Sequence, residues 1–295
     1  MDRETLIARS AECLKGGLAA VTGTGQQYTF TYSIAGAPVA GEKATITLTD
    51  QSTGLQKQVG NGTITGLAGT FCFTYNNKEY VLAGPTVYMS AVGSPTVWND
   101  PSGVGNGSIT LTNYSRTPEN LIAMVNFQGR LAFFSRQTTQ LWQVNADPDL
   151  WALQQILQNV GTMAALSVQA KGDFDVFFLS DTGIRSLRAK ETTLNAFVED
   201  LGSPIDSLIV AAIQADDLNA ALASGIVDPS TGQYWLHLNG TIYVFSYYPT
   251  SEVFAWSTFV PTDNAGASFT PTKFAILNGQ VWCRAGNKLY RYGGS

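Results

Sequence analysis

The chain has 295 residues, of which 44% are hydrophobic and only 13% are charged, and its formal net charge is −5. The apolar content excludes global disorder, and the sparse, slightly acidic charge argues against binding along nucleic acid, which needs clustered Lys and Arg. Three widely spaced cysteines argue against a disulfide framework; we expect buried thiols, with a bridge between Cys72 and Cys283 as the alternative.

The first residues are expected to form a helical arm. Over residues 3–20 apolar side chains recur at near-helical spacing, and Asp2 and Glu4 favour the N-terminal end of the helix dipole. An isolated helix of this length is marginal in water. The arm, residues 1–20, should therefore dock on the rest of the chain or on a partner.

Two strands are expected next. Residues 28–34 and 43–49 alternate apolar and polar side chains, as half-buried strands do. They lie in a hairpin region, residues 21–62. This region either closes a β-propeller or forms a small insertion.

The remainder, residues 63–295, repeats one short phrase: a glycine turn between two apolar and aromatic runs. The turn glycines of its five copies are Gly69, Gly129, Gly172, Gly232 and Gly279. Hairpin-built repeats of roughly 40–60 residues are typical of a β-propeller. A sixth hairpin could come from the two early strands, so we predict an all-β fold, a propeller of five to six blades. A two-layer β-sandwich is the alternative.

Three insertions are expected between the repeats. Residues 93–108 are rich in Gly, Ser, Pro and Asn and predict a loop. Within residues 147–160, a proline and an acid placed as helix starts prefer predict a helix over residues 152–159. Within residues 214–225, an Ala- and Leu-rich run behind two aspartates predicts a second short helix.

Candidate chemical groups are few. The single histidine, His237, is interpreted as a blade residue bonded to a backbone group, because no catalytic partner set surrounds it in the sequence. Asp173 and Asp175 lie on one strand face and do not straddle a substrate as a glycosidase pair must. One histidine and three scattered cysteines cannot supply a zinc site. We therefore predict no catalytic residue, no metal site and no cofactor.

Tryptophans are the best candidates for sugar contacts. Most sit in blade positions and suit a core, but Trp98 and Trp151 fall in a loop or an insertion and are expected to be more exposed. They keep a glycan-binding, lectin-like propeller open as the second hypothesis. A glycoside hydrolase on the same scaffold is the third.

Two stretches carry a resemblance to a known family. Residues 126–131 lead to Leu141 and Trp142, and residues 242–249 are followed by residues 253–257. These phrases resemble the propeller proteins of bacteriophage tails, and most closely the nozzle (tail tubular) protein of short-tailed phages. The match covers roughly residues 120–295, and its motifs are moderately specific because many propellers share the style.

The resemblance implies a structural virion protein of the phage tail, made in the host cytoplasm, with no enzymatic activity and no membrane contact. It implies a homo-hexameric ring below the portal and the head-to-tail adaptor, with tail fibre or needle proteins as further partners. DNA would be retained and ejected through the channel without sequence-specific binding. The expected assembly contacts are Leu6, Ile7, Leu14, Leu150, Trp151 and Ile156.

Overall fold

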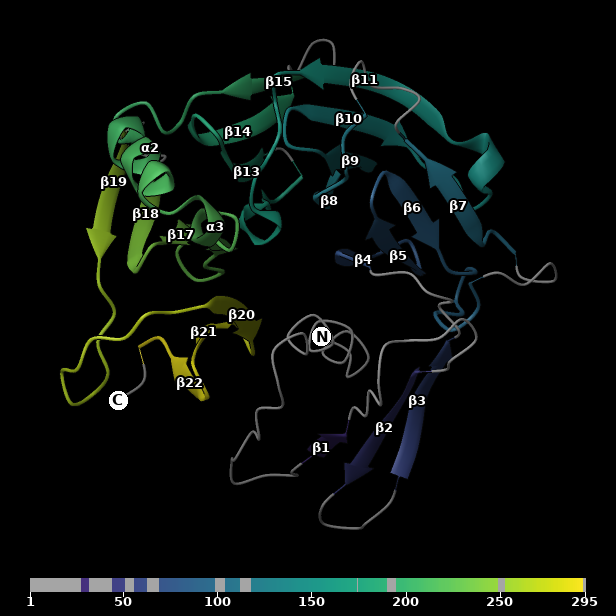
Figure 1. Ribbon diagram of the computed structural model, residues 1–295, viewed down its shortest axis with the longest axis horizontal. Helices are drawn as coiled ribbons and strands as arrows, with labels where there is room; N and C mark the ends of the chain where they lie inside the picture. The colour runs from purple at the N-terminus through teal and green to yellow at the C-terminus, as the bar shows by residue number, and fades with distance from the viewer. Residues whose placement is uncertain are drawn as a thin grey trace. The chain divides into compact units, whose positions relative to one another are not determined.

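The structure is a computed structural model (Figure 1). It describes residues 28–31, 44–50, 56–62, 69–98, 104–111, 118–173, 175–189, 195–248 and 253–293. The predicted arm at residues 1–20, with Leu6, Ile7 and Leu14, lies outside these ranges. No helix in the described ranges is long and apolar enough to cross a membrane.

The chain divides into two compact units. The first contains Met1–Leu111 with Asn145–Leu150, and the second contains Thr112–Val144 with Trp151–Ser295. Every sheet in both units is antiparallel.

The first unit holds two sheets. Three strands form the first: β1 (Tyr28–Thr31), β2 (Ala44–Asp50) and β3 (Gln56–Gly62). Four strands form the second: β4 (Phe71–Tyr75), β5 (Lys78–Ala83), β6 (Thr86–Met89) and β7 (Gly107–Thr110). The two early strands predicted from alternation are confirmed over their described residues. The loop predicted at 93–108 is confirmed over its described residues up to the start of β7.

The second unit holds four sheets, which follow one another in chain order from teal to yellow in Figure 1. The first contains β8 (Ala123–Phe127), β9 (Arg130–Phe134), β10 (Thr138–Gln143) and β11 (Ala152–Gln158). The second contains β12 (Gln169–Lys171), β13 (Asp175–Ser180), β14 (Gly183–Ala189) and β15 (Ala196–Glu199). The third contains β16 (Ser224–Val227), β17 (Tyr234–Leu238), β18 (Thr241–Tyr248) and β19 (Val253–Phe259). The last contains β20 (Lys273–Leu277), β21 (Gln280–Ala285) and β22 (Lys288–Arg291).

Short helical segments lie between the strands. They are η3 (Pro148–Leu150), η4 (Ala165–Ser167), α2 (Asp206–Ala215) and α3 (Asp217–Ala220).

The hairpin turns explain why the repeated phrase folds as it does. The turns at Gln128-Gly129, Asn239-Gly240 and Asn278-Gly279 have both central residues at positive φ. Such turns match the right-handed twist of the flanking strands, and Asn and Gly adopt this conformation most readily. Each copy of the repeated sequence pattern therefore forms either the first hairpin of a blade or the hairpin that follows it.

Contacts between sheets define the architecture. In the second unit β12 contacts β8 and β16, and β16 contacts β20, so the first strands of successive sheets lie together. Four-stranded meanders that pack through their first strands are blades of a β-propeller. With the β4–β7 sheet of the first unit there are five blade sheets, so the predicted all-β propeller is confirmed and the β-sandwich is excluded.

The main core lies between the β12–β15 and β16–β19 sheets and is sealed by α2. Phe177, Tyr234 and Phe245 pack as a ring cluster, with centroids 5.0 Å and 5.7 Å from that of Phe177. Ile209 and Ile213 of α2 are buried in the same cluster. The helix thus covers apolar surface that two sheets alone would leave open.

Two local predictions need correction. Residues 152–159 are not helical: β11 pairs with β10 from Gln158 opposite Thr138 to Ala152 opposite Gln143. Hydrogen bonds from the neighbouring strand override the helix propensity of Ala, Leu and Gln here. The helix predicted over residues 215–224 is confirmed only in part, because α3 covers Asp217–Ala220, whereas α2 ends at Ala215 and Ser224 already begins β16.

Candidate functional site

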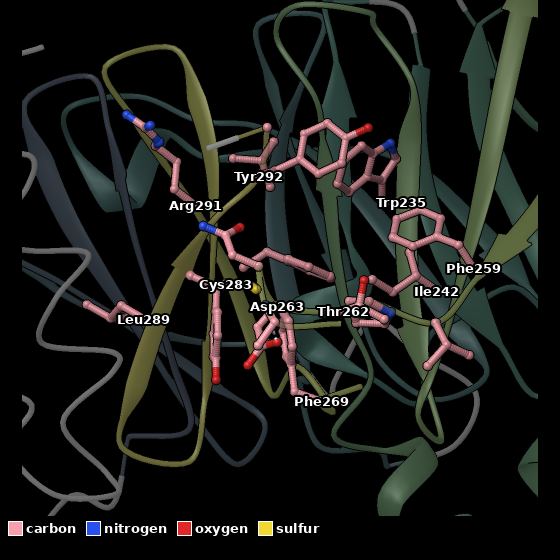
Figure 2. Close-up of a pocket in the computed structure, with 18 residues that line it drawn as sticks. Trp235, Ile242, Phe259, Thr262, Asp263, Phe269, Cys283, Leu289, Arg291 and Tyr292 are labelled. Carbon is pink, nitrogen blue, oxygen red and sulfur yellow. Dashed lines mark hydrogen bonds between the residues drawn. The ribbon is translucent and has the colours of Figure 1, made fainter. Parts of the chain in front are cut away.

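A pocket of about 750 Å³ lies between the β16–β19 and β20–β22 sheets (Figure 2). Small-molecule and peptide sites in proteins commonly have volumes in this range, roughly 300–1,000 Å³. Four stretches of chain line it: β17 and β18, the connection after β19, the β20–β21 hairpin, and β22 with the two residues that follow. It is the strongest candidate site in the described part of the chain.

The floor of the pocket is a packed apolar interface. Trp235, Ile242 and Val244 of one sheet meet Val281 of the other, and all four side chains are buried. Phe259 and Phe274 pack against this cluster. Because the floor is filled, a ligand can enter only the outer part of the gap between the sheets.

Aromatic rings form the walls. The ring of Trp235 meets those of Phe259 and Tyr292 edge to face, with centroids 5.5 Å and 4.6 Å away. On the other side Phe269 stacks on Tyr290 at 3.9 Å with an interplanar angle of 9°. Rings of this kind offer large apolar area that loses little conformational freedom on binding.

The loop that borders the pocket is braced by Asp263. Its carboxylate accepts hydrogen bonds from the backbone N–H groups of Ala265 (3.0 Å) and Ala267 (2.9 Å). Thr262 and Ser268 pair across the same loop as an isolated bridge. Asp263 therefore holds a wall of the pocket in place.

The chemistry of the lining suits binding. Its charged side chains are Asp263, which is committed to the loop, and Arg291 on β22. Burial raises the pKa of the Cys283 thiol to about 11, so the thiol stays protonated at neutral pH and is a poor nucleophile.

The expected histidine arrangement is confirmed. His237 in β17 is buried, and its Nε2 accepts a hydrogen bond of 3.1 Å from the Gly240 N–H. Burial lowers the pKa of the imidazole to about 4. His237 is therefore neutral at pH 7 and holds the β17–β18 turn.

The two carboxylates weighed as a glycosidase pair have different surroundings. Asp173 is exposed in the β12–β13 turn. Asp175 forms an ion pair of 2.8 Å with Arg188, and burial still raises its pKa above the ordinary value. Within the described residues, no group of three or more His, Cys, Asp or Glu side chains could hold a metal ion.

The structure places three of the expected assembly contacts. Leu150 in η3 is 64% exposed, and Ile156 on β11 is half-buried. Trp151, expected to be exposed, is buried because its ring packs against Phe133 and Trp142. Trp98 is half-buried. Whether Leu150, Trp151 and Ile156 make assembly contacts stays a prediction.

Cys72 and Cys283 are thiols, not partners in a disulfide, and both are half-buried. The open alternative of a bridge between them is therefore not realised in the structure.

The first unit contains a buried lysine that the sequence did not single out. Lys78 is almost fully enclosed, and its ammonium group donates to the backbone carbonyls of Gly105 and, at 3.0 Å, of Ala146. Burial lowers its pKa, and Asp147 acts in the opposite direction. With carbonyl oxygens as its hydrogen-bond acceptors, Lys78 ties the loop before β7 to residues 145–147.

Sequence reasoning also missed the pocket. Four aromatic residues line it whose contacts the repeat pattern does not predict: Phe259, Phe269, Tyr290 and Tyr292. The available signal was the concentration of aromatic residues near the last copy of the phrase. Nothing in spacing alone indicates which of these rings face one another.

Comparisons with known proteins support the fold. No protein-family model and no curated protein matches the chain. Among solved structures, one from Lactobacillus plantarum shares 12% identity, with a TM-score of 0.53 over 92% of this chain and 79% of that one. A functionally unknown protein from Desulfotomaculum acetoxidans shares 11% identity, with a TM-score of 0.51 over 93% and 85%. A Bacteroides uniformis protein, provisionally named a 6-phosphogluconolactonase, shares 11% identity, with a TM-score of 0.50 over 93% of both chains. At such low identity these similarities establish the β-propeller fold alone.

Proposed function

We propose that the protein is a non-enzymatic structural subunit that assembles with copies of itself into a ring, as the nozzle of a short-tailed phage tail does. The observation that carries the proposal is an exposed apolar cluster at the outer end of the third sheet of the second unit. We call it the β19 patch, and it consists of Tyr247, Val253 and Phe254.

The geometry of the β19 patch suits association. Tyr247 lies directly opposite Phe254 in the β18–β19 ladder, so these two side chains share one face of the sheet, and Val253, the first residue of β19, stands on the other face beside them. Their exposed fractions are 46%, 52% and 52%. Exposed apolar side chains gathered at one strand end mark interaction sites on soluble proteins, because leaving them in water is unfavourable.

The buried ionisable groups support a structural function. Burial acts to raise the pKa of Asp228, but hydrogen bonds from the Ser230 and Thr231 hydroxyls and backbone N–H groups together outweigh it and lower the pKa. Asp175, His237 and Lys78 are likewise tied to partners within the fold. Such ties hold loops and turns, whereas catalytic groups need a face open to substrate.

The resemblance to phage tail nozzles supplies the rest of the proposal: six copies, a DNA channel, and contact with the adaptor. The net charge of −5 agrees with a channel that does not retain DNA. Propellers also serve as enzymes and lectins, so the fold by itself favours none of these functions.

Light scattering of the full chain tests the proposal. We expect a mass that rises with concentration to that of a closed ring, and negative-stain images showing a central channel. The double variant Val253→Ser/Phe254→Ser should weaken association about 30-fold, as the loss of one interface hot spot does. Leu218→Ser/Leu222→Ser is the matched control, because both leucines are exposed and belong to a different segment, on and after α3.

Two results would count against the proposal. A monomer at every concentration, with no rings in the images, would contradict self-assembly. Equal weakening by the control variant would show that association is unspecific. If either result is accompanied by specific binding on a glycan array, the lectin-like alternative is favoured.

A further inference from the structure

The last sheet of the second unit is one strand shorter than its neighbours. The other three sheets of that unit have four strands, whereas β20–β22 has three. Among the described strands β22 is therefore an edge strand, and its residues Leu289, Tyr290 and Arg291 line the pocket described above. Edge strands present backbone groups that can pair with another chain.

The register identifies the backbone groups that point outward. The Tyr292 N–H donates to the Val281 carbonyl at 2.9 Å. In an antiparallel ladder, bonded and non-bonded positions alternate. Tyr290, opposite Cys283, thus also bonds toward β21, while Leu289 and Arg291 direct their N–H and C=O groups to the outer edge.

Side chains around this edge combine apolar surface and positive charge. Val260, Leu289 and Tyr292 are exposed large apolar residues beside it. Residues 264–295 contain four Lys and Arg and no Asp or Glu, although the whole chain is acidic. Within the described residues, neither Lys288 nor Arg291 forms an ion pair with a carboxylate.

Another sheet of this protein shows how such cations are satisfied. In β14, Arg188 pairs with Glu199 of the fourth strand β15, and Arg185 pairs with Asp200, directly after β15, at 2.7 Å. The fourth strand and the residue after it thus supply two of the carboxylates that pair with these arginines, and Asp175 of β13 and Asp206 of α2 supply the others. The β20–β22 sheet has the cations but, among the described strands, no fourth strand.

We propose that the β22 edge and the adjoining pocket bind an extended, acidic segment of a different polypeptide as a fourth strand. Backbone groups of Leu289 and Arg291 pair with it, its apolar side chains enter the pocket beside Tyr290 and Tyr292, and its carboxylates face Lys288 and Arg291. The described strands of this chain already lie in sheets, so neither this chain nor a second copy has one to spare among them. This inference goes beyond the proposed ring assembly and does not depend on it.

The test uses the full chain and a fluorescein-labelled peptide with the sequence of residues 195–201, which spans β15 and carries Glu199 and Asp200. Fluorescence anisotropy should show saturable binding that weakens with added salt. A peptide with Gln and Asn in place of the two acids should bind about fivefold more weakly. A peptide N-methylated at alternate residues cannot form the backbone ladder, so its affinity should be lower by about tenfold or more.

Protein variants locate the site. Lys288→Gln/Arg291→Gln should weaken binding of the acidic peptide about fivefold and leave the Gln/Asn peptide unaffected. Arg136→Gln, which removes a surface cation on the β9–β10 connection, is the matched control and should bind as the native chain does. Unchanged amide exchange in β8 to β19 checks that each variant is folded.

Amide exchange of Leu289 and Arg291 separates the possible occupants. We expect fast exchange in the protein alone and slow exchange with the acidic peptide. Slow exchange in the dilute protein alone would mean that the chain covers its own edge, and protection that grows with protein concentration would mean a second copy. Either result would overturn the proposal, as would absence of peptide binding or equal binding of the N-methylated peptide.

Discussion

Single buried polar residues in this protein are held by backbone groups, and His237 is the clearest case. Its Nε2 accepts the Gly240 N–H within a buried strand, so protonation would remove the acceptor and place a charge in the core. The pKa of about 4 follows from this desolvation. Lys78 shows a different arrangement, because its side-chain nitrogen donates to two backbone carbonyls.

The stability of the protein should depend on pH through His237. Its folded pKa of about 4 lies below its ordinary value of 6.5, so the unfolded chain binds the proton more readily. The stabilising contribution is complete above pH 6.5 and is lost as pH falls toward 4. By linkage, the free energy of unfolding should fall by about 2 kcal/mol from this group between pH 7.5 and pH 5.

Urea unfolding of the native chain and His237→Gln at both pH values measures this contribution. The native chain should lose about 2 kcal/mol more than the variant between the two conditions. Equal losses would mean that other groups account for the acid sensitivity.

Replacing Lys78 should destabilise the first unit. Lys78→Met keeps the aliphatic stem but leaves the carbonyls of Gly105 and Ala146 without their charged donor. We expect a loss of about 2 kcal/mol in the free energy of unfolding, measured by urea denaturation. Faster amide exchange confined to residues 104–111 would locate the effect, whereas an unchanged midpoint would show that water replaces the donor.

At the scale of elements, close approach between strands decides which residues fit. A Cβ on Gly225 in β16 would lie 2.9 Å from the Tyr234 ring and hydroxyl and 3.0 Å from the Ser167 carbonyl oxygen. The Tyr234 hydroxyl also donates to that oxygen at 2.9 Å. This one glycine lets β16 lie against both β17 and η4.

Gly225→Ala should therefore cost about 2 kcal/mol of stability through overpacking. The double variant Gly225→Ala/Tyr234→Phe should be less destabilised than the sum of the two single variants, because removal of the hydroxyl relieves one contact. Thermal or urea unfolding of the four proteins measures the coupling. Strict additivity would mean that the strain lies in the backbone contact with Ser167.

Strand β11 shows that tertiary contacts can override the local preference of a sequence for helix. Residues 152–158 contain good helix formers, yet they pair along β10 as β11. The unpaired edge of β10 supplies hydrogen bonds and a half-buried surface that a helix at this position would forgo. Helix propensity has little influence on secondary structure where a neighbouring strand can form a ladder of backbone hydrogen bonds.

At the scale of the whole molecule, the charge distribution bears on DNA. Acidic residues outnumber basic ones, and the basic cluster after residue 263 is small. A channel subunit should let DNA pass, so we expect duplex DNA to bind with a dissociation constant weaker than about 10⁻⁴ M at physiological salt. Fluorescence anisotropy with a labelled duplex measures it, and tight binding with a steep salt dependence would contradict a passive channel wall.

Much of the fold could be predicted because its signals are local. Turn residues such as Gly129, Asn239 and Gly279 have positive φ, which Gly and Asn adopt readily in any context. Alternation of apolar and polar residues places the apolar side chains on one strand face. These properties need only a few neighbouring residues. They sufficed to predict hairpins, an all-β propeller and the backbone-bonded His237.

The pocket, the buried Trp151 and the strand β11 were decided only by tertiary structure. Trp235 in β17 meets Tyr292, directly after β22, because the β16–β19 and β20–β22 sheets pack together, and Phe269 of the connection between those sheets stacks on Tyr290. Trp151 is buried because β9 and β10 present Phe133 and Trp142 to it. Burial and strand pairing are properties of distant contacts, so the amino-acid sequence determined the repeating hairpins, and the packing of those hairpins determined the site.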